Sequence, residues 1–103
     1  MDGMPRAGRY RHIAAVLFDQ HNLAEMARHH ISKAEADQLI LNRYIVVQNP
    51  RGRSDSIMLI GETNGGRLVT MPLTPLDDHG LWRPATAFDA SRHQRRLFQR
   101  DAR

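Results

Sequence analysis

Hydrophobic positions in the first part of the chain recur at helical spacing. Leu23 and Met26 would lie on one face of a helix over about 20–29. Asp19 directly precedes that stretch and is suited to the N-cap, because its carboxylate can accept hydrogen bonds from free backbone amides. The apolar run 13–18 is too short for periodicity to distinguish a strand from the approach to the helix.

A second helix is predicted almost immediately afterwards. Ser32 and Glu35 have the spacing of a capping box, in which each side chain accepts a hydrogen bond from a backbone amide at the helix start. The apolar positions of this helix follow at i, i+3 and i+4: Ala36, Leu39 and Ile40. Only residues 30–31 separate the two helices, so they should meet in a tight corner.

From residue 44 onward the pattern becomes that of β-strands, rich in β-branched and aromatic residues. Strands are expected over 44–47, 57–60, 68–73 and 81–88. Asn64-Gly65-Gly66 predicts a hairpin between the second and third of them. Pro84 cannot donate to a ladder, which suggests an edge strand or a bulge in the fourth.

The chain closes with a predicted helix over about 91–101, capped by Asp89 or Ser91. The expected order is two N-terminal helices, a four-stranded antiparallel meander and a C-terminal helix, which is the α+β class. Residues 1–11 contain Gly and Pro among charges and are expected to be a flexible leader. Residues 12–103 are then a single domain.

The composition excludes several classes of protein. The chain has no cysteine, which rules out disulfide scaffolds, thiolate zinc sites and thiol nucleophiles. The longest apolar run, 13–18, is far shorter than the roughly 20 residues that cross a bilayer, and no small-residue cleavage site follows it. We therefore expect a cytoplasmic protein without a membrane partner.

Charge adds a positive bias that comes almost entirely from arginine. The net charge is +4, and Lys33 is the only lysine among 15 basic residues. Either arginine-rich codon usage or a partner rich in phosphate or carboxylate would explain this bias. The arginines concentrate in the last helix, where we expect RNA phosphate contacts from Arg92, Arg95, Arg96 and Arg100.

Other polar residues permit two interpretations each. Arg28 and His29 end the first helix, where they could stabilise phosphate charge and move protons, or complement the helix dipole. Glu62 and Arg67 flank the hairpin and could form a cross-strand ion pair or act on a substrate. Arg83 in the fourth strand could be solvated or reach a ligand. His21, His29 and His30 have no carboxylate obviously placed with them, so no metal site and no cofactor are expected.

In combination, the motifs resemble those of the BrnT-like toxin family. The similarity begins with Phe18-Asp19, the stretch Ala27-Arg28-His29-His30-Ile31-Ser32 and Glu35-Ala36. It continues with Ile60-Gly61-Glu62-Thr63 and Gly66-Arg67, which resemble that family's central hairpin. The segment from Arg83 to Ser91, followed by an Arg-rich helix, resembles its closing strand and helix. The similarity covers about residues 18–99.

This resemblance implies a compact RelE-like fold and a ribonuclease toxin of a type II toxin–antitoxin pair. Such a toxin cleaves RNA without metal, uses the ribose 2′-hydroxyl as nucleophile and is blocked by a cognate antitoxin. The residues that correspond to the family's site are Arg28, His29, Glu62, Arg67 and Arg83. A homodimer and a toxin–antitoxin heterotetramer both remain open as assemblies.

The sequence also departs from the family pattern. His30 replaces a glycine at the helix corner, and Phe88 stands where many members have Arg. Gln94 and Phe98 replace a Glu and a Tyr of the last helix. The missing carboxylate and hydroxyl favour an alternative, a toxin homologue that no longer cleaves and serves as a non-enzymatic protein- or RNA-binding module.

Overall fold

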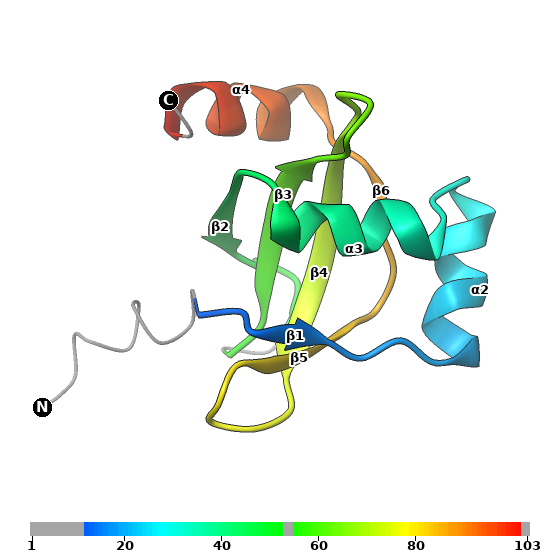
Figure 1. Ribbon diagram of the computed structural model, residues 1–103. Coiled ribbons are helices and arrows are strands. Elements are labelled where there is room, and N and C mark those ends of the chain that lie inside the picture. Colours follow the sequence, from blue (N-terminus) through cyan, green and yellow to red (C-terminus); the bar gives the residue numbers. More distant parts are fainter. Residues whose placement is uncertain (1–11, 53–54, 102–103) are drawn as a thin grey trace, which may run out of the picture.

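The computed structural model describes residues 12–52 and 55–101, which form three helices and a six-stranded sheet (Figure 1). The helices are α2 (Gln20–Arg28), α3 (Lys33–Leu41) and α4 (Arg92–Asp101). The strands are β1 (Ala15–Val16), β2 (Tyr44–Gln48), β3 (Ile57–Glu62), β4 (Leu68–Pro75), β5 (Leu81–Pro84) and β6 (Phe88–Asp89). The predicted α+β class is confirmed, whereas the expected leader, 1–11, lies outside the described residues.

Both N-terminal helices begin with the side-chain caps that the sequence predicts. The Asp19 carboxylate accepts a hydrogen bond from the Asn22 backbone N–H at 2.8 Å, and the Asn22 side chain accepts one from the Asp19 N–H at 2.9 Å. Ser32 and Glu35 form the same reciprocal pair at the start of α3. Each cap satisfies amides that have no partner within the helix.

The corner between α2 and α3 requires a left-handed residue, and His30 supplies it with a φ of 60°. The His30 N–H donates to the Ala27 carbonyl, and the Ile31 N–H donates to the Met26 carbonyl, each at 3.0 Å. These two bonds form a Schellman motif, which usually places glycine at the position of His30. Histidine at this position is strained, because its Cβ crowds the backbone in the left-handed region.

The sheet differs from the expected four-stranded antiparallel meander. Its strands lie in the order β1-β5-β4-β3-β2, with β6 paired to β4. Strands β2 to β5 are antiparallel neighbours, but β1 is parallel to β5, so the sheet is mixed. The undecided run 13–18 therefore contributes a strand. Its Ala14 and Ala15 amides donate to the Gly80 carbonyl, and its Leu17 amide donates to the Trp82 carbonyl.

The predicted single strand over 81–88 is wrong, because it divides into β5 and β6. Thr70 of β4 pairs with Phe88, and Leu73 of β4 pairs with Pro84. The two pairs are three residues apart on β4 but four residues apart on the opposite segment. One extra residue is thus accommodated on that side, as in a β-bulge. The break follows Pro84, which has no N–H to donate.

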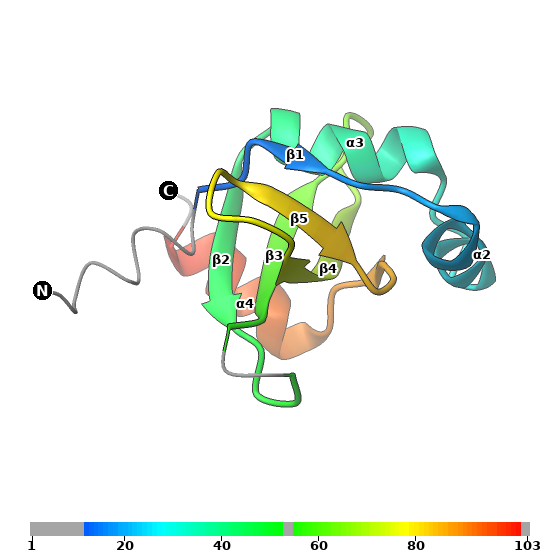
Figure 2. The same cartoon turned by 90° about the horizontal axis from the view of Figure 1, so that it is seen from below.

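The sheet is covered on both faces (Figure 2). Strands β2, β3 and β4 lie between α3 on one side and α4 on the other. The larger core lies on the α2–α3 face and contains Met26, Leu39, Leu59, Val69, Met71 and Trp82. A smaller core on the α4 face contains Ile60, Leu68, Ala90 and Phe98. A membrane-spanning helix would have to be longer and more apolar than any helix among the described residues.

Candidate functional site around Asp89

Arg67 joins the β3–β4 hairpin to three other parts of the chain. Its Nε donates to the Asp89 carboxylate at 2.7 Å, and Nη1 donates to the His30 carbonyl at 2.8 Å. Nη1 also lies 3.5 Å from a Glu35 carboxylate oxygen, and Nη2 lies 3.4 Å from the His29 carbonyl. Four contacts occupy most of the five N–H groups of a guanidinium. Arg67 therefore ties the hairpin to the α2–α3 corner and to β6.

Asp89 is where charges from several elements converge. The hydrogen bond from Arg67 lowers the pKa of Asp89, and the positive charges of Arg67, Arg95 and His29 lower it further. Arg95 comes from α4 and His29 from the end of α2, so positive charges from two further elements stabilise this carboxylate. We call Asp89, Arg67, Glu35, His29 and Arg95 the Asp89 junction.

The two carboxylates of the junction are ionised at neutral pH. The Ser32 backbone N–H holds the pKa of Glu35 below its usual value, with further lowering from the Ser32 hydroxyl and from Arg67. The hydrogen bond to Asp89 in turn raises the pKa of Arg67. Their lowered pKa values make both carboxylates weak bases, because the ideal general base has a pKa near the working pH. Their chemical role is to orient cations.

His29 is the exposed imidazole of the junction. Its ring meets the Phe88 ring edge-to-face, with centroids 5.9 Å apart and planes at 62°, and its backbone is the C-cap of α2. Arg28 beside it is 74% exposed and makes one long ion pair, 3.5 Å, with Glu25. Both therefore present polar atoms to solvent at the α2–α3 corner, where a ligand could reach them.

The expectation that Glu62 and Arg67 face each other across the hairpin is wrong. The register pairs Glu62 with Leu68, and alternate residues of a strand point to opposite faces. Glu62 therefore shares the α4 face with Leu68, whereas Arg67 turns to the α3 face. In the described part of the chain, no cation forms an ion pair with the Glu62 carboxylate.

Arg83 lies away from the junction. Its Nε and Nη2 both lie 2.9 Å from one carboxylate oxygen of Asp19, the cap of α2. The Asn22 amide is the main reason that the pKa of Asp19 is lowered, and Arg83 lowers it further. Arg67 contacts the other end of α2, and nine helical residues span about 14 Å. Arg83 and Arg67 therefore cannot hold the same phosphate.

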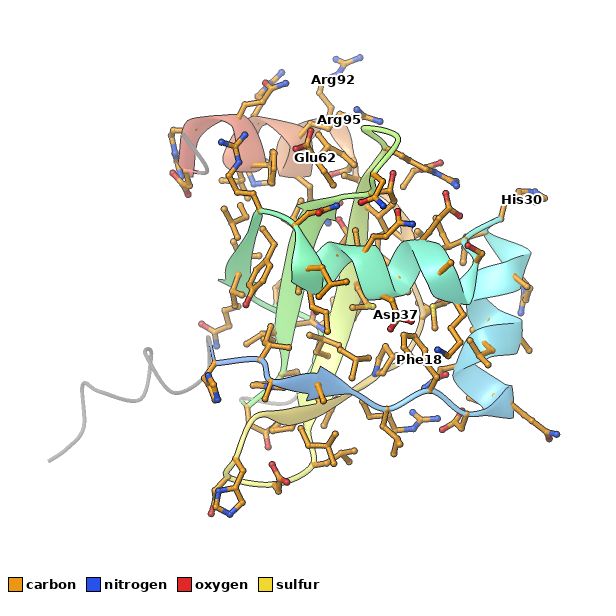
Figure 3. The ribbon with its side chains drawn as sticks, in the orientation of Figure 1. Phe18, His30, Asp37, Glu62, Arg92 and Arg95 are labelled. Carbon is orange, nitrogen blue, oxygen red and sulfur yellow. The ribbon has the colours of Figure 1, made fainter. Side chains whose placement is uncertain are left out.

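The arginines of α4 form an exposed basic surface. Arg92, Arg95 and Arg96 are exposed, and Arg100 is also exposed but forms an ion pair with Asp101 at 2.8 Å. Figure 3 shows Arg92, Arg95 and Glu62 at the same end of the molecule, where α4 begins. We call Arg92, Arg95 and Arg96 the α4 basic surface. Through Arg95 it is continuous with the Asp89 junction.

The two unusual residues of the last helix have structural partners. The Gln94 side-chain oxygen accepts hydrogen bonds from the buried Thr70 hydroxyl and from the Ser91 N–H, each at 2.8 Å. The Ser91 hydroxyl accepts from the Gln94 N–H at 3.1 Å, so Ser91 rather than Asp89 caps α4. Phe98 is buried in the smaller core. These two positions fasten α4 to the sheet.

Metal ligands do not cluster in this part of the molecule. No group of three or more His, Asp or Glu side chains that could hold a metal ion occurs among the described residues.

The resemblance placed His29 and Arg67 in one site, whereas Arg95 was expected separately as an RNA phosphate contact, and two members of the junction were missed. Asp89 was expected only as a helix cap, and Glu35 only as part of a capping box. Their common signal was a carboxylate beside a predicted element boundary, but the sequence could not show that both boundaries meet at Arg67.

Comparisons with protein-family models, curated proteins and solved structures find no match to this chain.

Proposed function

We propose that this protein is a metal-independent endoribonuclease toxin of a type II toxin–antitoxin pair, as its resemblance to BrnT-like toxins implies. The observation that carries the proposal is the Asp89 junction. It combines the exposed imidazole of His29 and the exposed guanidinium of Arg95 with one carboxylate that Arg67 fixes in place, beside the rest of the α4 basic surface. Phosphate-rich RNA suits this combination, because arginine binds phosphate oxygens and histidine moves protons near neutral pH.

In the proposed reaction, the α4 basic surface holds the RNA backbone and His29 moves the proton. The ribose 2′-oxygen attacks the adjacent phosphorus while its proton passes to a base. The bond to the 5′-oxygen breaks, and that oxygen takes up a proton. The products are a 2′,3′-cyclic phosphate and a 5′-hydroxyl end. Arg95 and Arg28 can stabilise the negative charge on the phosphoryl oxygens of the transition state, since their guanidinium groups are exposed. Arg67 is a positioning residue, because its donors are already occupied.

Two roles of the resembled site are changed in this proposal. Glu62 and Asp89 lie on different strands, with β4 between them, so two strand spacings separate them by about 10 Å. We therefore give proton transfer to His29 and leave Glu62 to contact the ribose or the neighbouring nucleotide. Arg83, paired with Asp19, stabilises the start of α2 and does not touch the scissile phosphate.

The proposed partners are RNA and a cognate antitoxin in the cytoplasm. A positively charged toxin favours an antitoxin whose contacting segment is acidic. If that segment covers the α4 basic surface, it excludes RNA and neutralises the toxin. Association should then become slower at high salt, because screening weakens attraction between exposed charges.

The decisive experiment is induction of the full chain alone, followed by RNA analysis. We expect growth arrest and fragments that end in 2′,3′-cyclic phosphate, with cleavage by purified protein unaffected by chelator. His29→Ala should lower cleavage by about a hundredfold, equivalent to about 2.7 kcal/mol of transition-state stabilisation, with RNA affinity retained. His30→Ala is the matched control, because it removes the neighbouring imidazole. Cleavage that requires added metal would contradict the mechanism.

A specific observation favours the second candidate function, a binding module that does not cleave. Arg67 and Arg83, which correspond to site residues of the resembled family, are each held by carboxylates of the same chain. A folded chain that binds RNA but leaves it intact, also in the presence of ribosomes, would establish this alternative.

A further inference from the structure

The three free edges of the sheet are not equally protected. In the described part of the chain, β2 pairs only with β3, and its outer edge has no partner. The other edges end in β1 and β6, which have two residues each. Very short edge strands are a usual protection against pairing with another chain. β2 has five residues, Tyr44-Ile-Val-Val-Gln48, with no charge, proline or bulge.

The ladder between β2 and β3 determines which backbone groups face outward. The Asn49 N–H donates to the Ser56 carbonyl at 3.3 Å, which makes this a hydrogen-bonded pair. Hydrogen-bonded pairs alternate along an antiparallel ladder, so Ile45 and Val47 also bond to β3. The N–H and C=O groups of Tyr44, Val46 and Gln48 consequently point away from the sheet.

We propose that two copies of this chain pair through antiparallel β2 strands, with the two-fold axis beside Val46. In this register, Val46 meets Val46 of the second copy, and Tyr44 meets Gln48. Each of these is a pair of outward-pointing residues, so six backbone hydrogen bonds form in one continuous sheet. Two-fold symmetry requires such self-complementarity of the contact surface.

The side chains agree with the same register. Ile45 lies opposite Val47 of the second copy on the α4 face, where both already pack against the smaller core. Arg43, just before the strand, lies opposite Asn49, so no like charges meet across the axis. β-Branched pairs of this kind stabilise a sheet.

Charge also complements at the rim of this interface. Asp101, at the end of α4 and already in an ion pair with Arg100, lines a hollow along the edge with Tyr44, Ile45 and Val46. The exposed Arg51 lies just beyond Gln48. Because Gln48 of the second copy pairs with Tyr44, its Arg51 comes to the end of the strand where Asp101 lies. The two Tyr44 residues are displaced along the strands by four positions, about 13 Å.

The test is the molar mass of the full chain in solution as a function of concentration. We expect a change from about 11.8 kDa to twice that mass as concentration rises. The dimer should be reversible, because one five-residue strand edge is a small contact. Gln48→Pro removes one outward N–H from each copy and should raise the dimer dissociation constant at least tenfold. Gln48→Ala is the matched control, because it shortens the same side chain and keeps the N–H.

Amide hydrogen exchange tests the register without any substitution. Protection of the Val46 amide should increase with protein concentration, whereas the Ile45 and Val47 amides, bonded to β3, should not change. Monomeric protein up to several hundred micromolar would overturn the proposal. A dimer that Gln48→Pro leaves intact, together with unchanged Val46 exchange, would also overturn it. A monomer that instead captures an unrelated extended peptide at β2 would show that the occupant is not a second copy.

Discussion

Arg67 and Arg92 illustrate two kinds of arginine in one small protein. Arg67 is 31% exposed and gives its donors to Asp89, Glu35 and two backbone carbonyls. Arg92, in the first turn of α4, is exposed, and no carboxylate of the described residues forms an ion pair with it. The difference teaches that placement relative to carboxylates, not residue type, separates an arginine that holds the fold together from one available to a ligand.

The largest expected effect is loss of RNA binding when the available arginines are removed. The triple variant Arg92→Ala, Arg95→Ala, Arg96→Ala should reduce affinity for single-stranded RNA at least tenfold. The slope of the logarithm of the binding constant against the logarithm of salt concentration should also become shallower by about 2, at about 0.7 per phosphate contact. Titrations at several salt concentrations measure both quantities. Arg83→Ala is the control, because it removes an arginine that Asp19 already holds. An unchanged slope would remove the distinction between the two kinds of arginine.

The next effect concerns stability and should appear at Arg67. Arg67→Ala leaves Asp89 and the His30 carbonyl without this donor and removes one ion-pair partner from Glu35, so the free energy of unfolding should fall by about 1–2 kcal/mol. Denaturant titration measures this loss. RNA affinity should change by less than about threefold. Arg67→Lys should recover only part of the stability, since an ammonium cannot reproduce the forked contacts. A large loss of RNA affinity at full stability would instead identify Arg67 as a phosphate ligand.

A smaller effect is expected at the other end of α2. Asp19→Ala removes both the helix cap and the partner of Arg83, and should lower the free energy of unfolding by about 1 kcal/mol. Arg83→Ala keeps the cap and should cost less, because exposed ion pairs contribute about 0–1 kcal/mol. The two variants are compared by denaturant titration. Equal losses would mean that the ion pair, rather than the cap, stabilises this end.

The smallest expected effect is a loss of stability at low pH. The pKa values of Asp19, Glu35 and Asp89 are lowered in the folded chain. The three carboxylates therefore stabilise the folded chain above their unfolded pKa of about 4, and this stabilisation is lost as the pH falls below that value and through their lower folded pKa values. The unfolding temperature should decrease between pH 5 and pH 3, over a range of about 2 pH units. Asp89→Asn should reduce that decrease, and an identical acid profile would show that Asp89 contributes nothing.

Local signals predicted the helices well. The caps at Asp19 and Ser32 depend on residues three apart, so the sequence contains both partners of each hydrogen bond. The Asn64-Gly65-Gly66 turn is equally local, and Gly66 has the positive φ that such a turn needs. The short strands β1 and β6 were not predicted, because a two-residue strand is defined only by the neighbour with which it pairs.

The sequence by itself determined the three helices, most of the strands and the positive charge of α4, whereas the folded chain decided that His30 takes the left-handed position. Only the tertiary structure decided which side chains meet. Strand register sent Glu62 and Arg67 to opposite faces, and β6 brought Asp89 to Arg67, 22 residues away along the chain. Contacts of this kind depend on packing between distant segments, whose geometry no local pattern of residues encodes.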